Sequence, residues 1–217
     1  MRPIVLNVGA LATASANAIC LSQTPTGATA MTLNGALVSG GVARIPQTRR
    51  IRITTVADET AKTFTVVGTT YGGSPATEVI TGVNASTVDS VLDYATVTSI
   101  TPSGATTGAI TVGTSPVAGS AWARMDDWAL SSIALQVGVT GTVNYTVQQT
   151  MDDPNSPTDA VALASVKWVN SSDTNVVSAT ATQQSSYSFV PMFVRVVLNS
   201  GTGSISATVR QSGVNPI

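Results

Sequence analysis

The chain has 217 residues, enough for one large β domain or two smaller ones that each bury a core. Charged residues make up 10% of it, against roughly 25% in ordinary globular proteins. The formal net charge of −1 argues against broad electrostatic binding of nucleic acid, which needs clustered Lys and Arg. A chain this poor in charge predicts that part of its surface faces other protein subunits.

The chain has no histidine and one cysteine, Cys20. This composition removes the Ser-His and Cys-His nucleophile pairs and the common metal sites. It also leaves no partner for an intrachain disulfide. We expect Cys20 to be a small buried hydrophobic residue in a protein that folds in a reducing cytoplasm.

Residues 1–20 predict an extended N-terminal arm. Ile4 and Leu6 lie on one side of the extended chain, and Pro3 fixes its start. Pro3 and Asn7 interrupt the apolar stretch too early for a secretory leader. No apolar run approaches the ~20 residues that span a bilayer. We therefore expect an arm that packs on its own domain or on a neighbouring subunit.

Residues 21–118 predict an N-terminal β domain. Asn34-Gly35 is a strong hairpin pattern between Met31–Leu33 and Ala36–Val38, and Ser39-Gly40-Gly41 predicts a second turn. Further strands are expected at Arg50–Val56, Thr63–Gly68, Thr77–Gly82, Tyr94–Ile100 and Ala109–Val112. Because turn residues separate these segments, we expect a meander of neighbouring antiparallel strands.

The one basic cluster of the chain lies at the start of this meander. It consists of Arg44, Arg49, Arg50 and Arg52. Arg50 and Arg52 alternate with apolar residues, which favours a solvated or subunit-facing strand over a polyanion site. Charge on an outer strand face also discourages wrong edge pairing.

A linker composition over residues 113–120 places a domain boundary near Gly119. Residues 119–217 then predict a C-terminal β-sandwich domain. Trp122 and Trp128 follow the boundary directly, and we expect them to pack across it or against another subunit. Because Ile133–Val139 and Val143–Val147 both alternate around Gly141-Thr142, they predict a hairpin of two long strands.

The end of the chain predicts two further strands. Phe189–Leu198 is the most apolar run, and Ser204–Arg210 alternates after a turn at Asn199–Gly203. Arg195 is expected to point out of the core or to pair with a carboxylate. Both halves together predict an all-β fold of two antiparallel β-sandwich or jelly-roll-like domains, without an internal sequence repeat.

Paired carboxylates are the remaining basis for catalysis. The pairs are Asp58-Glu59, Asp89 with Asp93, Asp126-Asp127 and Asp152-Asp153. Two carboxylates held ~5 to 9.5 Å apart would suit hydrolysis of a polysaccharide. Clefts for sugars are usually lined with aromatic residues, however, and these total only 5% of the chain. We expect solvated loop carboxylates and no enzyme.

One loop offers a calcium site as an alternative. Its oxygen-bearing residues are Asp152, Asp153, Asn155 and Asp159. Their spacing matches no EF-hand, and Asx turns around Pro154 and Pro157 account for the same residues. We therefore predict neither a metal ion nor a cofactor.

Several strand-like runs resemble those of structural proteins of tailed-bacteriophage virions. They are Val38–Ala43, Thr63–Thr69, Glu78–Ala85 and Ala95–Ile100 in the first half, and Gly141–Thr150, Asp152-Asp153-Pro154, Val194–Val196 and Asn199–Ser204 in the second. The likeness covers most of the chain. It offers no catalytic residues to transfer.

The resemblance implies a structural component of the virion that assembles in the host cytoplasm. We expect a capsid decoration, or cement, protein: a homo-oligomer, with a trimer favoured, that binds the major capsid protein only in the assembled shell and stabilises it. The arm would be exchanged with a neighbour. Candidate subunit contacts are Ile4, Leu6, Trp122 and Trp128, and no nucleic acid or membrane partner is expected.

Two other functions are compatible with the residues. One is a neck or tail component, such as a collar or fibre-attachment protein. The other is a carbohydrate-binding or receptor-binding module, which predicts an exposed cleft holding Trp122, Trp128, Trp168 or Tyr187.

Overall fold

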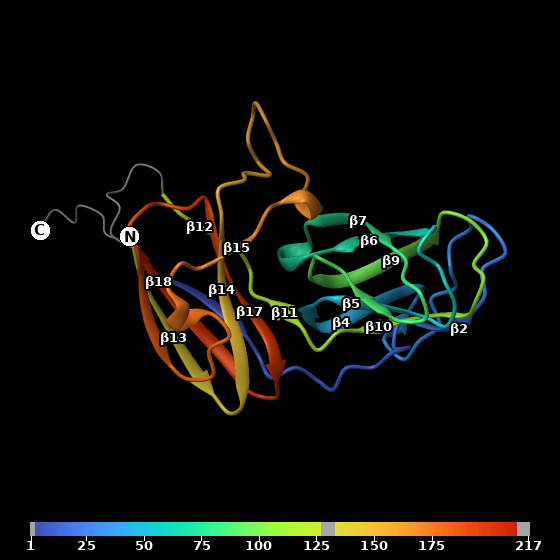
Figure 1. Cartoon of the computed structure of the whole chain (residues 1–217), viewed down its shortest axis with the longest axis horizontal. Coiled ribbons are helices and arrows are strands. Elements are labelled where there is room, and N and C mark those ends of the chain that lie inside the picture. Colours follow the sequence, from blue (N-terminus) through green and yellow to red (C-terminus); the bar gives the residue numbers. More distant parts are fainter. Residues whose placement is uncertain (1–2, 127–132, 212–217) are drawn as a thin grey trace, which may run out of the picture. The chain divides into compact units, whose positions relative to one another are not determined.

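The computed structural model describes residues 3–126 and 133–211, which form β-strands with three short 3-10 turns (Figure 1). They make two compact units. Unit 1 comprises residues 1–12 and 117–217, and unit 2 comprises Thr13–Pro116. The predicted all-β, antiparallel architecture is confirmed.

The first twenty residues are divided between the two units and do not form a separate arm. Strand β1 (Ile4–Val8) pairs with β18 (Ser204–Gln211), so it belongs to unit 1, whereas the chain from Thr13 belongs to unit 2. The sequence of a short strand does not indicate which distant strand it pairs with, so the pairing of β1 with β18 could not be predicted. The boundary predicted near Gly119 lies close to the second crossing, after Pro116.

Unit 1 is a sandwich of a four-stranded and a five-stranded sheet. Besides β1 and β18 its strands are β11 (Ala118–Gly119), β12 (Ala123–Arg124), β13 (Ile133–Thr140), β14 (Val143–Thr150), β15 (Val169–Asn170), β16 (Gln183–Tyr187) and β17 (Phe193–Gly201). The four-stranded sheet has the order β1-β18-β13-β16. The other has the order β11-β17-β14-β15, and β12 continues the line of β11 along β17.

This strand order is that of a jelly roll. With β11 and β12 counted as one interrupted strand, the described strands of unit 1 run first-eighth-third-sixth in one sheet and second-seventh-fourth-fifth in the other. Consecutive strands therefore mostly alternate between the two sheets, as in the double-sheet jelly rolls. Unit 2 is inserted between the first and the second of these strands.

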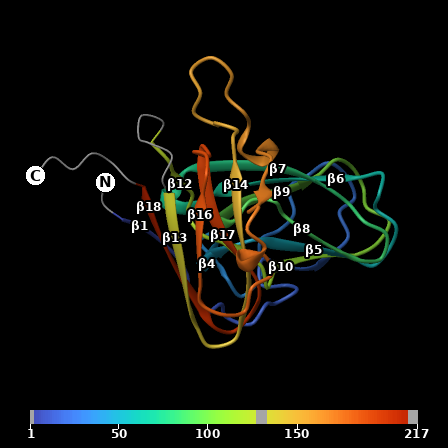
Figure 2. The ribbon, with the colours of Figure 1, turned by 60° about the vertical axis from the view of Figure 1, so that its left-hand side comes forward.

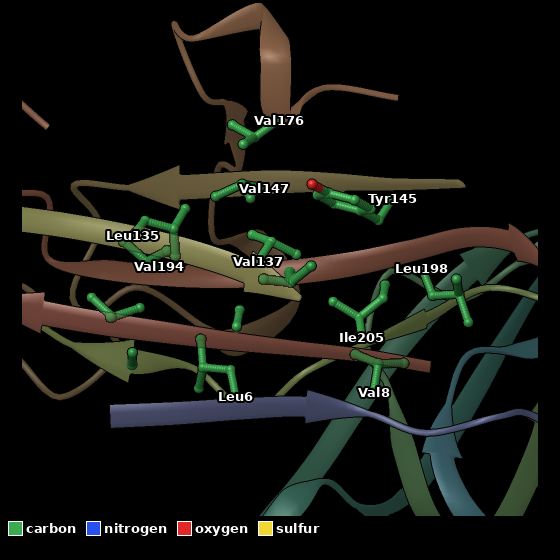
Figure 3. Close-up of a cluster of buried hydrophobic side chains, with 14 of the residues drawn as sticks. Leu6, Val8, Leu135, Val137, Tyr145, Val147, Val176, Val194, Leu198 and Ile205 are labelled. Carbon is green, nitrogen blue, oxygen red and sulfur yellow. The ribbon is translucent and has the colours of Figure 1, made fainter. Parts of the chain in front are cut away.

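The core of unit 1 lies between its two sheets (Figure 3). Leu6 and Val8 of β1 contribute to it from the four-stranded sheet, and Tyr145 and Val147 of β14 from the five-stranded one. The alternation visible in the sequence produces this packing, because every second residue of a strand points to the same face.

The predicted hairpin around Gly141-Thr142 is wrong. Strand β13 lies in the four-stranded sheet and β14 in the five-stranded one, so the turn crosses the sandwich. The turn from β17 to β18 makes the same crossing, and Gly203 N donates a hydrogen bond of 2.9 Å to Thr142 O between the two turns. The alternation of apolar residues determines which side chains face the core. It is the same whether the turn joins two strands of one sheet, as in a hairpin, or crosses from one sheet to the other, as in an arch.

Unit 2 consists of the same two kinds of sheet. Its elements are β2 (Cys20–Gln23), β3 (Val38–Ser39), β4 (Val42–Arg49), β5 (Ile51–Thr55), β6 (Thr63–Thr69), η1 (Tyr71–Gly73), β7 (Pro75–Thr81), β8 (Thr87–Asp89), β9 (Tyr94–Pro102) and β10 (Ile110–Thr114). The sheets have the orders β2-β10-β5-β8 and β3-β4-β9-β6-β7. With β3 set aside as an edge addition, the order is again that of a jelly roll.

The expected meander is therefore wrong in its connections. Only β6 and β7 form a hairpin of consecutive strands within Arg50–Val112, whereas β5 pairs with β8 and β10. The turn at Gly40-Gly41 is confirmed by the pairing of β3 with β4, and both glycines have positive φ. Cys20 is fully buried as predicted, and burial raises the pKa of its thiol to about 12.

The Asn34-Gly35 hairpin is also wrong. Residues 31–37 form no strand, and the backbone N–H groups of Asn34 and Gly35 both donate to Ile19 O. A Cβ atom at Gly35 would lie 2.2 Å from the carbonyl carbon of Ala18. The glycine allows two backbone segments to approach closely. An Asn-Gly pair in the sequence is compatible with this role as well as with a turn.

The two ends of unit 2 are tied together. Thr114 N donates to Ser15 O at 2.8 Å, and Ser15 N donates to Thr114 Oγ1 at 3.1 Å. Gly113 makes room for this contact, because a Cβ atom there would overlap Ser15 O. The insert thus begins and ends at one place, as a self-contained unit requires.

Candidate functional site

Loop 151–168 connects β14 to β15 and, apart from the inserted unit 2, is the longest connection between consecutive strands of unit 1 among the described residues. It rises beyond the ends of these strands in both views (Figures 1 and 2). The equivalent connection of unit 2, from β6 to β7, needs only Thr70–Ser74. Long loops on a rigid scaffold are common places for binding.

The base of the loop is held by its carboxylates. Asp152 Oδ2 accepts the backbone N–H of Lys167 at 2.6 Å, which joins the two arms of the loop. Asp153 Oδ1 accepts the N–H of Asn155 at 2.8 Å, the Asx turn expected from the sequence, and Asp153 Oδ2 lies 3.6 Å from Arg124 Nη2. These partners occupy two of the residues considered for calcium. No metal-binding cluster occurs among the described His, Cys, Asp and Glu side chains.

The tip of the loop is almost uncharged. Between Pro154 and Val166 the only ionisable side chain is that of Asp159. Ala160 and Ala162 are exposed and Leu163 is half-buried, so small apolar groups face solvent there. At the base, Met151 is 68% exposed and Val169 is 60% exposed. Apolar groups are therefore exposed both at the tip and at the base of the loop.

An aromatic cluster supports the same end of the five-stranded sheet. The rings of Trp122 and Trp168 meet edge to face with centroids 4.9 Å apart, and Trp122 also lies 5.9 Å from Phe193. Trp122 is half-buried within unit 1. Trp128, the other tryptophan singled out in the sequence, lies outside the described residues.

Arg195 completes this cluster. Its guanidinium carbon lies 4.1 Å from the ring centroid of Trp168, and its Nε and Nη2 donate to Gln148 Oε1 at 3.0 and 2.8 Å. Arg195 points away from the sandwich core, since Val194 and Val196 face it. Arg195 is nevertheless only 2% exposed. Gln148 was not singled out from the sequence, because a glutamine on an outer strand face carries no distinctive pattern.

The residues expected to contact other subunits at the N-terminus lie within unit 1. Leu6 is 3% exposed and part of the core, and Ile4 is partly buried against the same cluster (Figure 3 shows Leu6). Exchange of residues 1–20 with a neighbouring subunit would therefore remove core contacts from this unit. These two side chains are poor candidates for a surface contact.

The exposed sugar-binding cleft expected from the aromatic residues is not formed by Trp168 or Tyr187. Tyr187 is 4% exposed and belongs to the core, and Arg195 lies over the face of Trp168. A groove of about 360 Å³ lies elsewhere in unit 1, on β1, β13 and β18, with Asn7, Gly138 and Ser206 in its lining. The lining residues include neither an aromatic nor a charged side chain, so the groove offers no stacking platform.

Two of the four arginines in the basic cluster of unit 2 are engaged within the fold. Arg52 makes a two-pronged ion pair with Asp89, with Nε–Oδ1 and Nη2–Oδ2 distances of 2.6 and 2.9 Å. Arg49 is 4% exposed and donates to Thr114 Oγ1 at 2.6 Å, and burial lowers its pKa. Arg44 is exposed. The expected solvated face is therefore wrong for Arg49, because the strand changes sheets directly after it.

The paired carboxylates serve different structural roles. Asp58 is exposed, as expected, and hydrogen bonds from Thr60 lower its pKa. Glu59 is 1% exposed, and its Oε1 accepts the N–H groups of Thr107 and Gly108 at 2.6 and 2.8 Å. The solvated-loop expectation is therefore wrong for Glu59, which ties its turn to another loop.

Two further carboxylates differ from the expectation. Asp93 is 6% exposed, so it is not solvated, and Asp89 is engaged by Arg52 and by the hydroxyl of Ser115 at 2.7 Å. Glu78 is 5% exposed and was not singled out at all. Its alternation with Ala76 and Ile80 could have revealed it, since the three share one strand face. Asp127 lies outside the described residues.

Comparisons with known proteins identify no relative: no protein-family model, no curated protein and no solved structure matches the chain. In the part of the chain that the structure describes, no helix is long and apolar enough to cross a membrane.

Proposed function

We propose that the protein is a structural component of a bacteriophage virion, most specifically a capsid decoration protein, and that loop 151–168 contacts the shell. The observation that carries the proposal is the loop itself: a long projection with an almost uncharged tip, anchored at its base, on one of two units with the same strand order. Closing the fold does not require it, since unit 2 closes the same connection with a tight turn.

The chemistry of the other candidate residues supports a structural role. The described carboxylates with the shortest hydrogen bonds hold backbone segments or an arginine, and Trp168 is covered by Arg195. The jelly-roll order is used by viral capsid proteins and also by lectins, so the fold alone decides nothing. The covered aromatic rings favour the capsid alternative over the lectin one.

In the proposed mechanism the loop binds only the assembled shell. A ligand that binds one state stabilises that state by its binding free energy, so the intact shell is favoured over dissociated subunits. We propose a homo-oligomer, with a trimer favoured, because several loops presented together add their binding through a high effective concentration.

The test is binding to particles that lack the protein. In the key variant a Gly-Ser-Gly linker replaces residues 156–164, which leaves Asp152, Asp153 and Lys167 at the base. We expect the variant to fold and its affinity for the shell to fall at least about tenfold. The matched control, Val56→Ser, alters an exposed apolar residue of unit 2 and should bind normally. Full binding of the loop variant would overturn the role of the loop.

The position on the virion is tested separately. Labelled protein spread over the whole head supports decoration. Label confined to one ring at the neck or tail supports the neck or tail alternative, and no bound label at all would reject a place in the mature virion.

A further inference from the structure

The outer edge of β7 is the longest strand edge of unit 2 that no described strand covers. Strand β7 has seven residues, ends the order β3-β4-β9-β6-β7 and pairs with β6 alone (Figure 1). The other edge strands of the unit, β2, β3 and β8, have four, two and three residues. Because an unpaired edge presents free N–H and C=O groups, a long one can pair with a strand of another chain.

The alternation of hydrogen bonds defines which backbone groups face this edge. Gly82 N donates to Lys62 O at 2.9 Å, directly after the last residue of β7. In an antiparallel pair every second residue bonds to the partner strand, so the even-numbered residues of β7 bond to β6. The N–H and C=O groups that point outward belong to Thr77, Val79 and Thr81.

The side chains of these three residues suit a second copy of the same edge. All three are exposed and uncharged, and Val79 is 60% exposed. Their order reads the same in both directions, so an antiparallel copy places Val79 opposite Val79 and Thr77 opposite Thr81. Such β-branched pairs stabilise neighbouring strands. Charged side chains, which commonly protect long edges, are absent from the exposed positions of β7.

Glu78 holds β7 in place from its inner face. Its side chain is 5% exposed, and its Oε1 and Oε2 accept the N–H groups of Val91 at 2.7 Å and Leu92 at 3.0 Å. An inward charge can discourage pairing at an edge, but both oxygens of this carboxylate are engaged by their own chain. A strand fixed in this way loses little conformational freedom when it binds.

We propose that β7 pairs with β7 of a second copy about a twofold axis at Val79, which joins the two five-stranded sheets into one. Thr77 then pairs with Thr81 of the second copy, and each such pair exchanges both backbone hydrogen bonds. Val67 of β6 is 37% exposed and lies diagonally beside Val79. The joined outer face therefore gathers two valines from each copy.

The contact is short and therefore weak. One pair of strand edges buries less than the ~1,000 Å² of a stable specific interface, so we expect pairing at high concentration or where copies are gathered together. A twofold contact joins two identical surfaces. Since a trimer has no twofold axis, the contact would join one proposed trimer to another. The inference concerns unit 2 and does not depend on the proposed function.

Disulfide cross-linking of the whole chain under oxidised glutathione tests the register. At the axis the two Val79 Cα atoms would lie about 5.5 Å apart, which a disulfide spans. Val79→Cys should therefore form linked dimers at least about tenfold faster than Val56→Cys, an exposed control position outside β7. The native Cys20 is fully buried. Two copies of Thr77 would lie more than about 10 Å apart, so Thr77→Cys should link to Thr81→Cys but not to itself.

Two outcomes of the cross-linking would overturn the proposal. One is linkage of Val79→Cys no faster than that of Val56→Cys. The other is linkage of Thr77→Cys to itself as fast as that of Val79→Cys, because the proposed register keeps these positions apart.

A charge at the axis tests the pairing without a cross-link. Val79→Lys places two positive charges opposite each other but alters only an exposed side chain of each folded chain. Sedimentation at up to about 1 mM protein should show association of the native chain that weakens at least about tenfold in Val79→Lys and not in Val56→Lys. Hydrogen exchange checks that both variants are folded. A native chain that does not associate, or association that Val79→Lys leaves unchanged, would reject the contact.

Discussion

The two units share one strand order and differ in what they add to it. In unit 2 the connection between the fourth and fifth strands is a tight turn in which Gly72 and Gly73 have positive φ. In unit 1 the same connection becomes loop 151–168, with a hydrogen-bonded base and an almost uncharged tip. Since the turn suffices to close a jelly roll, the extra residues of unit 1 call for a reason outside the fold.

The units also differ in how they bury charge. Unit 2 buries Glu59, Glu78 and Asp93, whereas the buried Arg195 of unit 1 lies on the outer side of its five-stranded sheet. The core of unit 1 is apolar apart from its tyrosine hydroxyls. We therefore expect the stability of unit 2 to depend more strongly on pH than that of unit 1.

The largest expected effect tests whether the units are separate folding bodies. Phe64 of unit 2 and Leu135 of unit 1 are both fully buried. Phe64→Ala should lower the free energy of unfolding of unit 2 by about 3–5 kcal/mol, and Leu135→Ala that of unit 1 by about 2–5 kcal/mol. Hydrogen exchange, resolved by residue, measures both. If each variant weakens both units equally, the units unfold together and the comparison of their separate stabilities fails.

A smaller effect is expected at the stacked turns of unit 1. Gly201 has a φ of 117°, and a Cβ atom there would lie 2.3 Å from Thr142 O. Gly201→Ala should cost unit 1 about 2–3 kcal/mol, since both strain and overlap oppose it. Gly40→Ala, at a φ of 61° with open space around it, should cost unit 2 only about 1 kcal/mol. Chemical denaturation compares the two; equal losses would mean that the turns of unit 1 can relax.

Much of the fold could be predicted from residue alternation alone. The faces of β5, β13 and β18 follow from their apolar residues, and so does the number of layers. Strand pairing could not be predicted, because Gly141-Thr142 suits an arch as well as a hairpin. The insertion of unit 2 could not be predicted either, because the sequence of Ile4–Val8 does not indicate that this strand pairs with β18.

The candidate site was less accessible to sequence reasoning. The Asx turn at Asp153 was predictable, because it depends on neighbouring residues. The stacking of Arg195 on Trp168 and the hydrogen bond from Leu92 N to Glu78 join residues that are distant in the sequence. The sequence therefore predicted solvent-exposed positions for some carboxylates, such as Glu59 and Asp93, that are buried in the fold.

Arg195 tests the support beneath loop 151–168. Arg195→Lys keeps the charge but loses the planar stack on Trp168 and one of the two hydrogen bonds to Gln148, which should cost unit 1 about 1–2 kcal/mol. The control is Arg124→Ala, which removes a 56% exposed side chain and a 3.6 Å ion pair and should cost at most about 0.5 kcal/mol. Thermal unfolding of unit 1 compares them. An equal loss would mean that the stack contributes nothing beyond its charge.

The smallest effect distinguishes the ion pair of unit 2 from its buried glutamate. Burial works to raise the pKa of Asp89, but hydrogen bonds from Arg52 and Ser115 and the charges of Arg52 and Arg50 outweigh it, and the pKa is lowered. The pair is partly solvated, with side-chain exposures of 30% and 20%, so we expect it to contribute about 1 kcal/mol. That stability is present above the ordinary pKa of aspartate and is lost as the pH falls through the lowered value. Asp89→Asn should remove this loss of stability below the ordinary pKa of aspartate. The opposite trend from Glu78 lies at higher pH, between the ordinary pKa of glutamate and its raised value, and should be the same in the native chain and the variant. A variant whose stability still falls at low pH would assign the acid loss to another carboxylate.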